Sequence, residues 1–123
     1  MRAPTIRRNA ERAAAARERK HWADVRKAVL AGPPTHHFEL KPRQFSPWIE
    51  TWQLKDQNRA YMWTWRGMSM RMYEEWQGDQ TPKTYICVEN ADDCGNGGPG
   101  YPYRIRFENI SQKPGVVSVF FFP

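Results

Sequence analysis

The chain has 123 residues, with 19 Lys and Arg against 13 Asp and Glu and a formal net charge of +6. This length fits one domain, and no stretch of the sequence approaches the roughly 20 apolar residues of a transmembrane helix. The first residues also lack the apolar run of a secretory signal. We therefore expect no transmembrane segment and a protein that is soluble or peripheral to a membrane.

The positive charge is concentrated in the first quarter of the chain. Residues 1–31 contain nine Lys and Arg and three acids, whereas residues 32–123 contain ten of each. The sequence thus predicts a basic arm joined to a neutral body. Such an arm suits an acidic partner, which can be RNA, anionic lipid headgroups or an acidic protein surface. The candidate anion-binding residues are Arg7, Arg8, Arg12, Arg17, Arg19 and Lys20.

The basic arm is predicted to be a single helix over residues 5–31. The run Asn9–Leu30 has no Gly or Pro, and Ala13–Ala16 has the highest helix propensity available. Gly32 and the two prolines after it form a strong stop signal. Apart from Ile6, large apolar side chains occur only toward the end of this helix, so most of it should be solvated or lie on a charged surface.

Residues 32–47 are predicted to be an extended linker, because four prolines interrupt regular structure there. Residues 48–123 then form a small aromatic-rich body. Leu is almost absent from the chain, whereas Trp, Tyr and Met, which are enriched at interface hot spots, are frequent. We expect the body to bury part of its apolar surface against a partner; the alternative is a compact aromatic core.

Residues 47–77 are predicted to be mainly helical, with a short helix over 47–54 and a second one ending at Gln77. Spacings of 4, 3, 4 and 4 residues would align an apolar stripe along the second helix. The alternative is a hairpin that pairs 49–54 with 60–65, because the aromatic residues there also alternate. The stripe consists of Tyr61, Trp65, Met68, Met72 and Trp76. The predicted partner-packing residues are Trp22, Trp48, Trp52, Trp65, Met68, Met72 and Trp76.

The last 40 residues are predicted to form a three-stranded antiparallel meander. Segments 84–89, 103–108 and 116–122 are rich in β-branched and aromatic residues, and a long Gly- and Pro-containing loop separates the first two. With the N-terminal helix and the central helical segment, this makes the predicted fold class α+β. Cys87 and Cys94 lie seven residues apart, which permits either a disulfide or two reduced thiols.

We predict no catalytic, cofactor-binding or metal-binding site. His36 and His37 have no cysteine or matched carboxylate nearby in the sequence, and adjacent acids such as Glu74 and Glu75 point apart in a strand. The glycine-rich segment 92–100 lacks the Lys-Ser/Thr pair of a P-loop and the spacing of a dinucleotide-binding motif.

These features predict a non-enzymatic accessory or structural subunit of a large multi-subunit assembly. Its basic arm and aromatic contacts would lace across neighbouring protein subunits. The Arg- and Ala-rich start is similar in composition to a mitochondrial targeting segment, which predicts a mitochondrial, respiratory-type complex as the setting. One alternative is a ribosomal or other RNA-binding protein whose arm contacts rRNA phosphates. Another is a small enzyme or ligand-binding domain that uses the glycine-rich segment.

Overall fold

The computed structural model describes residues 2–91 and 101–123, with the side chains of the first helix described from residue 9 onward. The chain divides into two compact units, Met1–Pro33 and Pro34–Pro123. The first unit consists of helix α1 (Arg2–Leu30), which ends just before the predicted glycine and proline stop. Most of its described side chains are exposed, as expected for a helix without a continuous apolar stripe.

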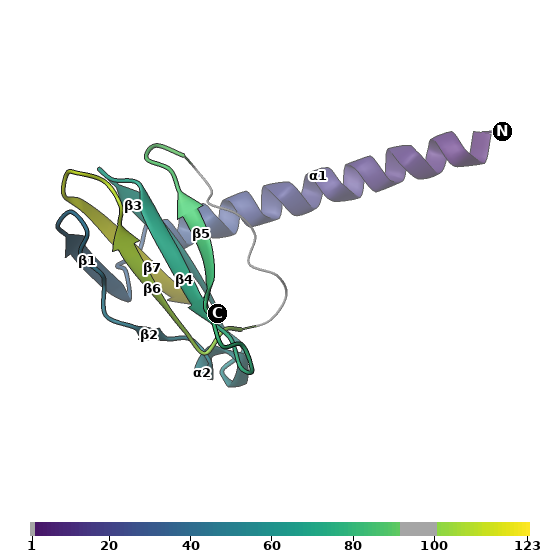
Figure 1. Ribbon diagram of the computed structural model, residues 1–123. Coiled ribbons are helices and arrows are strands. Elements are labelled where there is room, and N and C mark those ends of the chain that lie inside the picture. The colour runs from purple at the N-terminus through teal and green to yellow at the C-terminus, as the bar shows by residue number, and fades with distance from the viewer. Residues whose placement is uncertain (1, 92–100) are drawn as a thin grey trace. The chain divides into compact units, whose positions relative to one another are not determined.

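The second unit, called the body below, contains two antiparallel β-sheets and a one-turn helix (Figure 1). In sheet A, β7 lies between the two other strands, in the order β1 (His36–Leu40), β7 (Gly115–Phe122), β3 (Ala60–Arg66). In sheet B the order is β2 (Ile49–Glu50), β6 (Arg104–Asn109), β4 (Met70–Glu75), β5 (Lys83–Cys87). The short helix is α2 (Gln53–Asp56).

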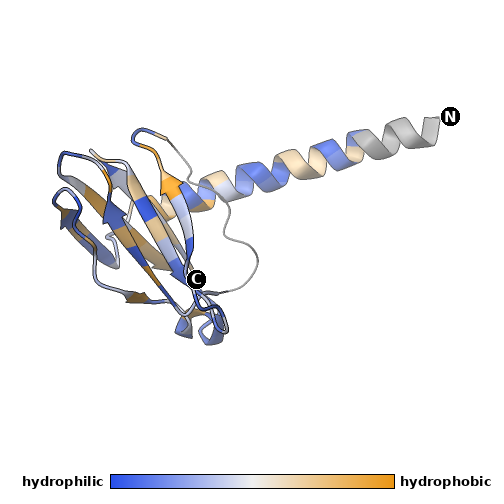
Figure 2. Ribbon diagram, in the orientation of Figure 1, coloured by the Kyte–Doolittle hydropathy of each residue, from blue (hydrophilic) through white to orange (hydrophobic). Residues whose placement is uncertain are grey.

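The core of the body forms where the inward-facing residues of both sheets meet. Burial alternates along the strands, as in Met70–Glu75, where every second residue is buried, and Figure 2 shows the matching alternation of hydropathy. The fully buried side chains come from both sheets and include Met70, Met72, Ile105, Phe107, Val117 and Val119. The body therefore has its own apolar core and does not depend on a partner to bury these residues.

The predicted central helical segment is wrong. Residues 60–66 and 70–75 form strands β3 and β4, which belong to different sheets. Gly67, with φ of +80°, turns the chain between them, a conformation that glycine adopts without steric cost. The alternative hairpin is not formed either, because β2 pairs with β6 and β3 pairs with β7. The only helix in 47–77 is the single turn α2.

The predicted three-stranded meander is also wrong, and the body is mostly β rather than α+β. Strands occur close to all three predicted positions, but β5 pairs with β4, β6 with β2 and β4, and β7 with β1 and β3. In a flat meander one face of each strand would remain in solvent. Placing β6 and β7 in facing sheets instead buries Phe107 together with Val117 and Val119.

The segment predicted as an extended linker contains strand β1. This five-residue strand fits between Pro34 and Pro42, so none of the prolines interrupts its pairing with β7. The chain then continues along sheet B, where Phe45 forms a bridge with Glu108. The prolines therefore limit the length of the strand without preventing it.

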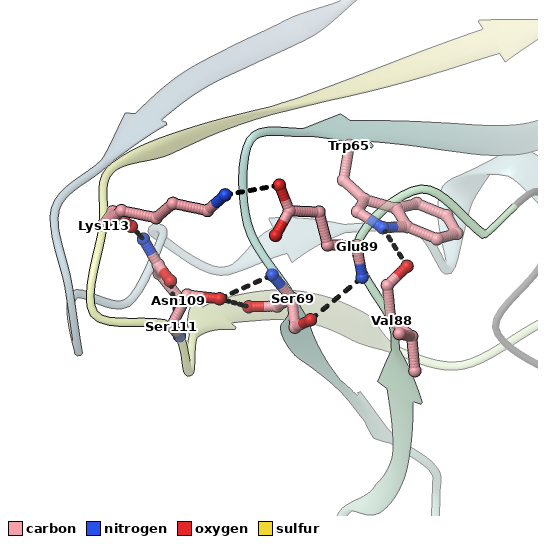
Figure 3. Close-up of polar contacts among 7 residues, drawn as sticks. All are labelled: Trp65, Ser69, Val88, Glu89, Asn109, Ser111 and Lys113. Atoms are coloured by element: carbon pink, nitrogen blue, oxygen red, sulfur yellow. Dashed lines mark hydrogen bonds and ion pairs between the residues drawn. The ribbon is translucent and has the colours of Figure 1, made fainter.

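Hydrogen bonds tie together the loops at one end of the body (Figure 3). The Ser69 N–H donates to Ser111 Oγ at 2.7 Å, and the Glu89 N–H donates to Ser69 Oγ at 2.9 Å. Asn109 Nδ2 donates to the Lys113 carbonyl oxygen, while Lys113 Nζ lies 2.6 Å from Glu89 Oε1. These bonds fix the β3–β4 and β6–β7 connections, where the chain crosses from one sheet to the other.

Candidate functional site

The outer face of sheet B is covered by alternating cationic and aromatic side chains. The guanidinium of Arg106 lies 4.4 Å from the ring centre of Phe45 and 4.5 Å from that of Trp48. The Arg104 guanidinium lies 4.2 Å from the same Trp48 ring centre. Arg106 Nε is buried and has no hydrogen-bond partner in the described part of the chain. Aromatic rings therefore provide the main surroundings of this guanidinium.

Carboxylates complete the same outer face. Arg104 forms an ion pair with Glu75, with an N–O distance of 2.8 Å. The Tyr73 hydroxyl donates to Glu108 Oε1 at 2.6 Å, and Arg71 lies 3.4 Å from the same oxygen. Two of the three arginines on this face are thus paired with carboxylates and the third, Arg106, lies among aromatic rings, so these cations already have partners within the body.

Other cations of the body also lie over aromatic rings. Lys55 lies over Trp52 at 5.2 Å, and Lys83 lies over Trp76 at the same distance. Arg59 lies 5.8 Å from the ring centre of Phe121. Three cations of the body have no such ring contact and no ion pair within the described chain, namely Lys41, Arg43 and Arg66. Most cations of the body therefore already have a ring or a carboxylate as a partner within the body.

A buried carboxylate lies inside the body, at the end of β4. Glu74 is 1% exposed, and it accepts hydrogen bonds from the Tyr61 hydroxyl and Trp76 Nε1, both at 3.3 Å. Burial, together with the negative charge of Glu74, raises the pKa of Tyr61 well above its usual value. Burial and the same carboxylate also raise the pKa of Tyr85. These hydrogen bonds compensate for the burial of the Glu74 carboxylate, so the cluster stabilises the fold.

Helix α1 presents its cations differently. Arg12, Arg19 and Arg26 are seven residues apart, so they lie on one face of the helix at intervals of about 10.5 Å. The residues three and four positions from each of them include no acid, and Ala15, Ala16 and Ala23 lie between them. All three arginines are exposed, and none forms an ion pair with another described residue. We call these three residues the arginine stripe.

The structure places the predicted anion-binding residues on α1, although not all on one face. Arg12 and Arg19 belong to the arginine stripe, whereas Arg17 lies on a different side of the helix and Lys20 lies next to the stripe. Arg7 and Arg8 are in the helix, but their side chains are outside the described part. Arg26 was missed, although its seven-residue spacing from Arg19 is visible in the sequence.

The predicted partner-packing residues divide into buried and exposed groups. Met68 and Met72 are fully buried in the core of the body, and Trp65 packs against that core while donating to the Val88 carbonyl oxygen. Trp22 on α1 is 56% exposed and Trp52 is 37% exposed. The other two are half-buried: Trp48 lies against Arg104 and Trp76 lies against Lys83.

Cys87 is buried in β5 and is disulfide-bonded. The other cysteine of the chain, Cys94, and the glycine-rich segment 92–100 lie outside the described residues. In residues 2–91 and 101–123 no three His, Cys, Asp or Glu residues come together as potential metal ligands. In the same residues no helix is both long and apolar enough to cross a membrane.

Comparison with known proteins identifies no relative. The chain matches no protein-family model, no curated protein and no solved structure. The functional evidence in this chain is therefore a contrast between two sets of cations: most of those in the body contact rings or carboxylates of the body, whereas the arginine stripe of α1 is exposed.

Proposed function

We propose that this chain is a non-enzymatic accessory subunit of a multi-subunit assembly, in which α1 binds an acidic surface of a neighbouring protein subunit. The observation that carries this proposal is the arginine stripe. Its three guanidinium groups are exposed and have no acid three or four positions away along the helix, whereas most cations of the body contact rings or carboxylates. Charges left unmatched on one face of a helix favour association with a complementary surface.

A protein partner fits the shape of the stripe better than a membrane does. A helix that lies on a bilayer needs a bulky apolar face, and apart from Ile6 α1 has large apolar residues only near its end, at Trp22, Val25, Val29 and Leu30. The small side chains of Ala15, Ala16 and Ala23 permit close approach of a neighbouring helix or loop. Acidic residues of that neighbour would then pair with the arginines, each bidentately.

RNA is the alternative partner, and the arginine content of the arm favours it. Arg binds phosphate through two parallel hydrogen bonds and is over-represented where phosphate is recognised. Against this alternative, the positive charge does not continue into the neutral body.

The setting that we propose is a compartment in which disulfides persist, because Cys87 is disulfide-bonded. The mitochondrial complex expected from the Arg- and Ala-rich start is compatible with this only where the mitochondrial environment is oxidising. Membership of a mitochondrial, respiratory-type complex therefore stays a proposal that the composition of the purified assembly would decide.

The experiment is an affinity purification of the tagged full-length chain from its native cells, with mass spectrometry and RNA sequencing of the captured material. We expect a stoichiometric set of protein subunits with little RNA. The variant Arg12→Gln/Arg19→Gln/Arg26→Gln keeps helix propensity and should lose that set. The charge-matched control Lys41→Gln/Arg43→Gln/Lys55→Gln, at three exposed cations of the body, should retain it. Capture of ribosomal RNA, lost in the arm variant, would instead establish the RNA alternative, and equal capture by both variants would overturn both.

A further inference from the structure

A small pocket opens on the outer face of sheet A. Three polar side chains form one row across the sheet, since Ser118 on the central strand β7 is in register with His37 on β1 and with Thr64 on β3. Arg66 is the next outward-facing residue of β3, opposite Val116. These residues line a pocket of about 120 Å³. All of them belong to the body, so the pocket does not depend on the placement of α1.

The pocket gathers hydrogen-bond donors. Nδ1 of His37 lies 2.8 Å from Oγ of Ser118, which holds the imidazole in place over the row. In the Nδ1–H tautomer the imidazole donates to Ser118 Oγ, and the Ser118 O–H is left free to donate to a ligand. The Thr64 hydroxyl adds one O–H donor, and the Arg66 guanidinium adds five N–H donors. Arg66 is exposed and has neither a ring contact nor an ion pair in the described chain, unlike most cations of the body.

The outward-facing carboxylate of Glu39 on β1 forms no ion pair with Arg66 among the described residues. Glu39 is in register with Val116 on one side of β7, and Arg66 is in register with Val116 on the other. Two strand spacings, about 10 Å, therefore separate the backbones of Glu39 and Arg66. The positive charge of Arg66 is left facing the hydroxyl groups across a surface that an anion can reach.

The arrangement favours binding over catalysis. A Ser–His pair is reminiscent of a nucleophile and its base, but acyl transfer also needs free N–H groups aimed at the developing oxyanion. Here Ser118 lies in the central strand, and the backbone on both sides of β7 pairs with β1 and β3. The pocket is also smaller than the roughly 300–1,000 Å³ typical of sites for drug-sized ligands or cofactors.

We propose that this pocket binds a single phosphate group, with Arg66 as the charged anchor and the hydroxyls of Ser118 and Thr64 as additional donors. A phosphate presents oxygens in several directions, so one group can meet donors from two strands at once, whereas a planar carboxylate meets fewer of them. A guanidinium with hydroxyl donors beside it is a combination that phosphate recognition commonly uses. The proposal does not depend on the function proposed for α1.

The test is an NMR titration of the full-length chain with inorganic phosphate, followed through the amide signals of β3 and β7 and the imidazole signals of His37. We expect saturable shifts at these positions. Arg66→Gln should weaken the apparent affinity by about tenfold or more, as expected when a charged hydrogen-bond partner is removed. Arg43→Gln, which removes an exposed arginine outside the pocket, should bind as the parent does.

Two further arms decide the chemistry and the location. Acetate should bind more weakly than phosphate, and equal or tighter binding of acetate would overturn the assignment to a phosphate group. Arg12→Gln/Arg19→Gln/Arg26→Gln should leave the pocket shifts unchanged, whatever it does to partner capture. Shifts that disappear in this arm variant, or that persist at full strength in Arg66→Gln, would show that phosphate binds elsewhere and would overturn the proposal.

Discussion

Helix α1 and the β-sheet body carry the same kinds of cationic side chain and use them in opposite ways. In the body, Arg106 lies among three aromatic rings and Arg104 joins a ring to a carboxylate. On α1, the arginine stripe faces solvent beside alanines. Cations that contact rings and carboxylates stabilise the fold, whereas cations without such partners are available to another molecule. The comparison shows that the surroundings of each arginine indicate its role better than the count of arginines in a region does.

The comparison also explains how a neutral body can contain so many arginines and tryptophans. Their flat surfaces pack against each other, so each guanidinium covers an indole or phenyl ring that would otherwise be exposed. The same composition is typical of interface hot spots, which is why it also predicted partner packing. In this chain much of that packing is internal.

The largest expected difference between the two regions concerns tryptophan. Trp48→Ala removes the ring that Arg104 and Arg106 both contact, and we expect it to lower the free energy of unfolding by about 2–3 kcal/mol through lost burial and cation–π contacts. Trp22→Ala on α1 should change it by less than about 0.5 kcal/mol, because Trp22 is mostly exposed. Urea denaturation followed by circular dichroism measures both. Similar losses in the two variants would break the comparison.

Arginine substitutions should show the same contrast at a smaller scale. Arg106→Gln should destabilise the body by about 1–2 kcal/mol, since it removes a guanidinium that contacts three rings. Arg19→Gln, with an equal change of charge, should leave stability within about 0.3 kcal/mol of the parent. The measurement is again the urea midpoint and slope. An unchanged free energy of unfolding in Arg106→Gln would mean that the ring contacts contribute little to stability.

Alkaline pH should weaken the body through Tyr61. Its pKa is raised in the folded chain by burial and by Glu74, whereas in the unfolded chain it titrates near 10. The contribution is therefore complete below pH 10 and is lost progressively above it, by up to about 1.4 kcal/mol per pH unit. Tyr61→Phe should give a shallower decline in stability above pH 10 than the parent. Thermal unfolding at pH 9 to 11 tests this, and identical slopes for Tyr61→Phe and the parent would contradict it.

The smallest effect is expected from removing α1. Deletion of residues 2–30 should leave the melting temperature of the body within about 2 °C of the full chain, because the core cluster consists entirely of body residues. Differential scanning calorimetry of both chains is the measurement. A large drop in the melting temperature would show that α1 is part of the folded unit.

Some parts of the fold could be predicted from local sequence. The N-terminal helix follows from an uninterrupted run of good helix formers and a Gly-Pro-Pro stop. The C-terminal strands follow from β-branched and aromatic alternation. Their partners could not be predicted in this way, because strand pairing depends on contacts between residues that are far apart in the chain.

The central segment shows why a helical pattern can be misleading. In β3 the inward-facing residues are Tyr61, Trp63 and Trp65, and in β4 they are Met70, Met72 and Glu74. The turn between the strands shifts the alternation, so a subset of these positions also has the spacing of a helix stripe. Gly67 was the local signal for the turn. The pocket on sheet A could not be predicted, because register alone brings His37, Thr64 and Ser118 together.

The most direct test compares thermal unfolding of two triple variants with the same loss of charge. Arg12→Gln/Arg19→Gln/Arg26→Gln should melt within about 2 °C of the parent, whereas Arg59→Gln/Arg104→Gln/Arg106→Gln should melt at least about 8 °C lower. This result would establish that the body uses its arginines for stability and that the arginines of α1 remain available to a partner. A comparable loss of melting temperature in both variants would contradict that division.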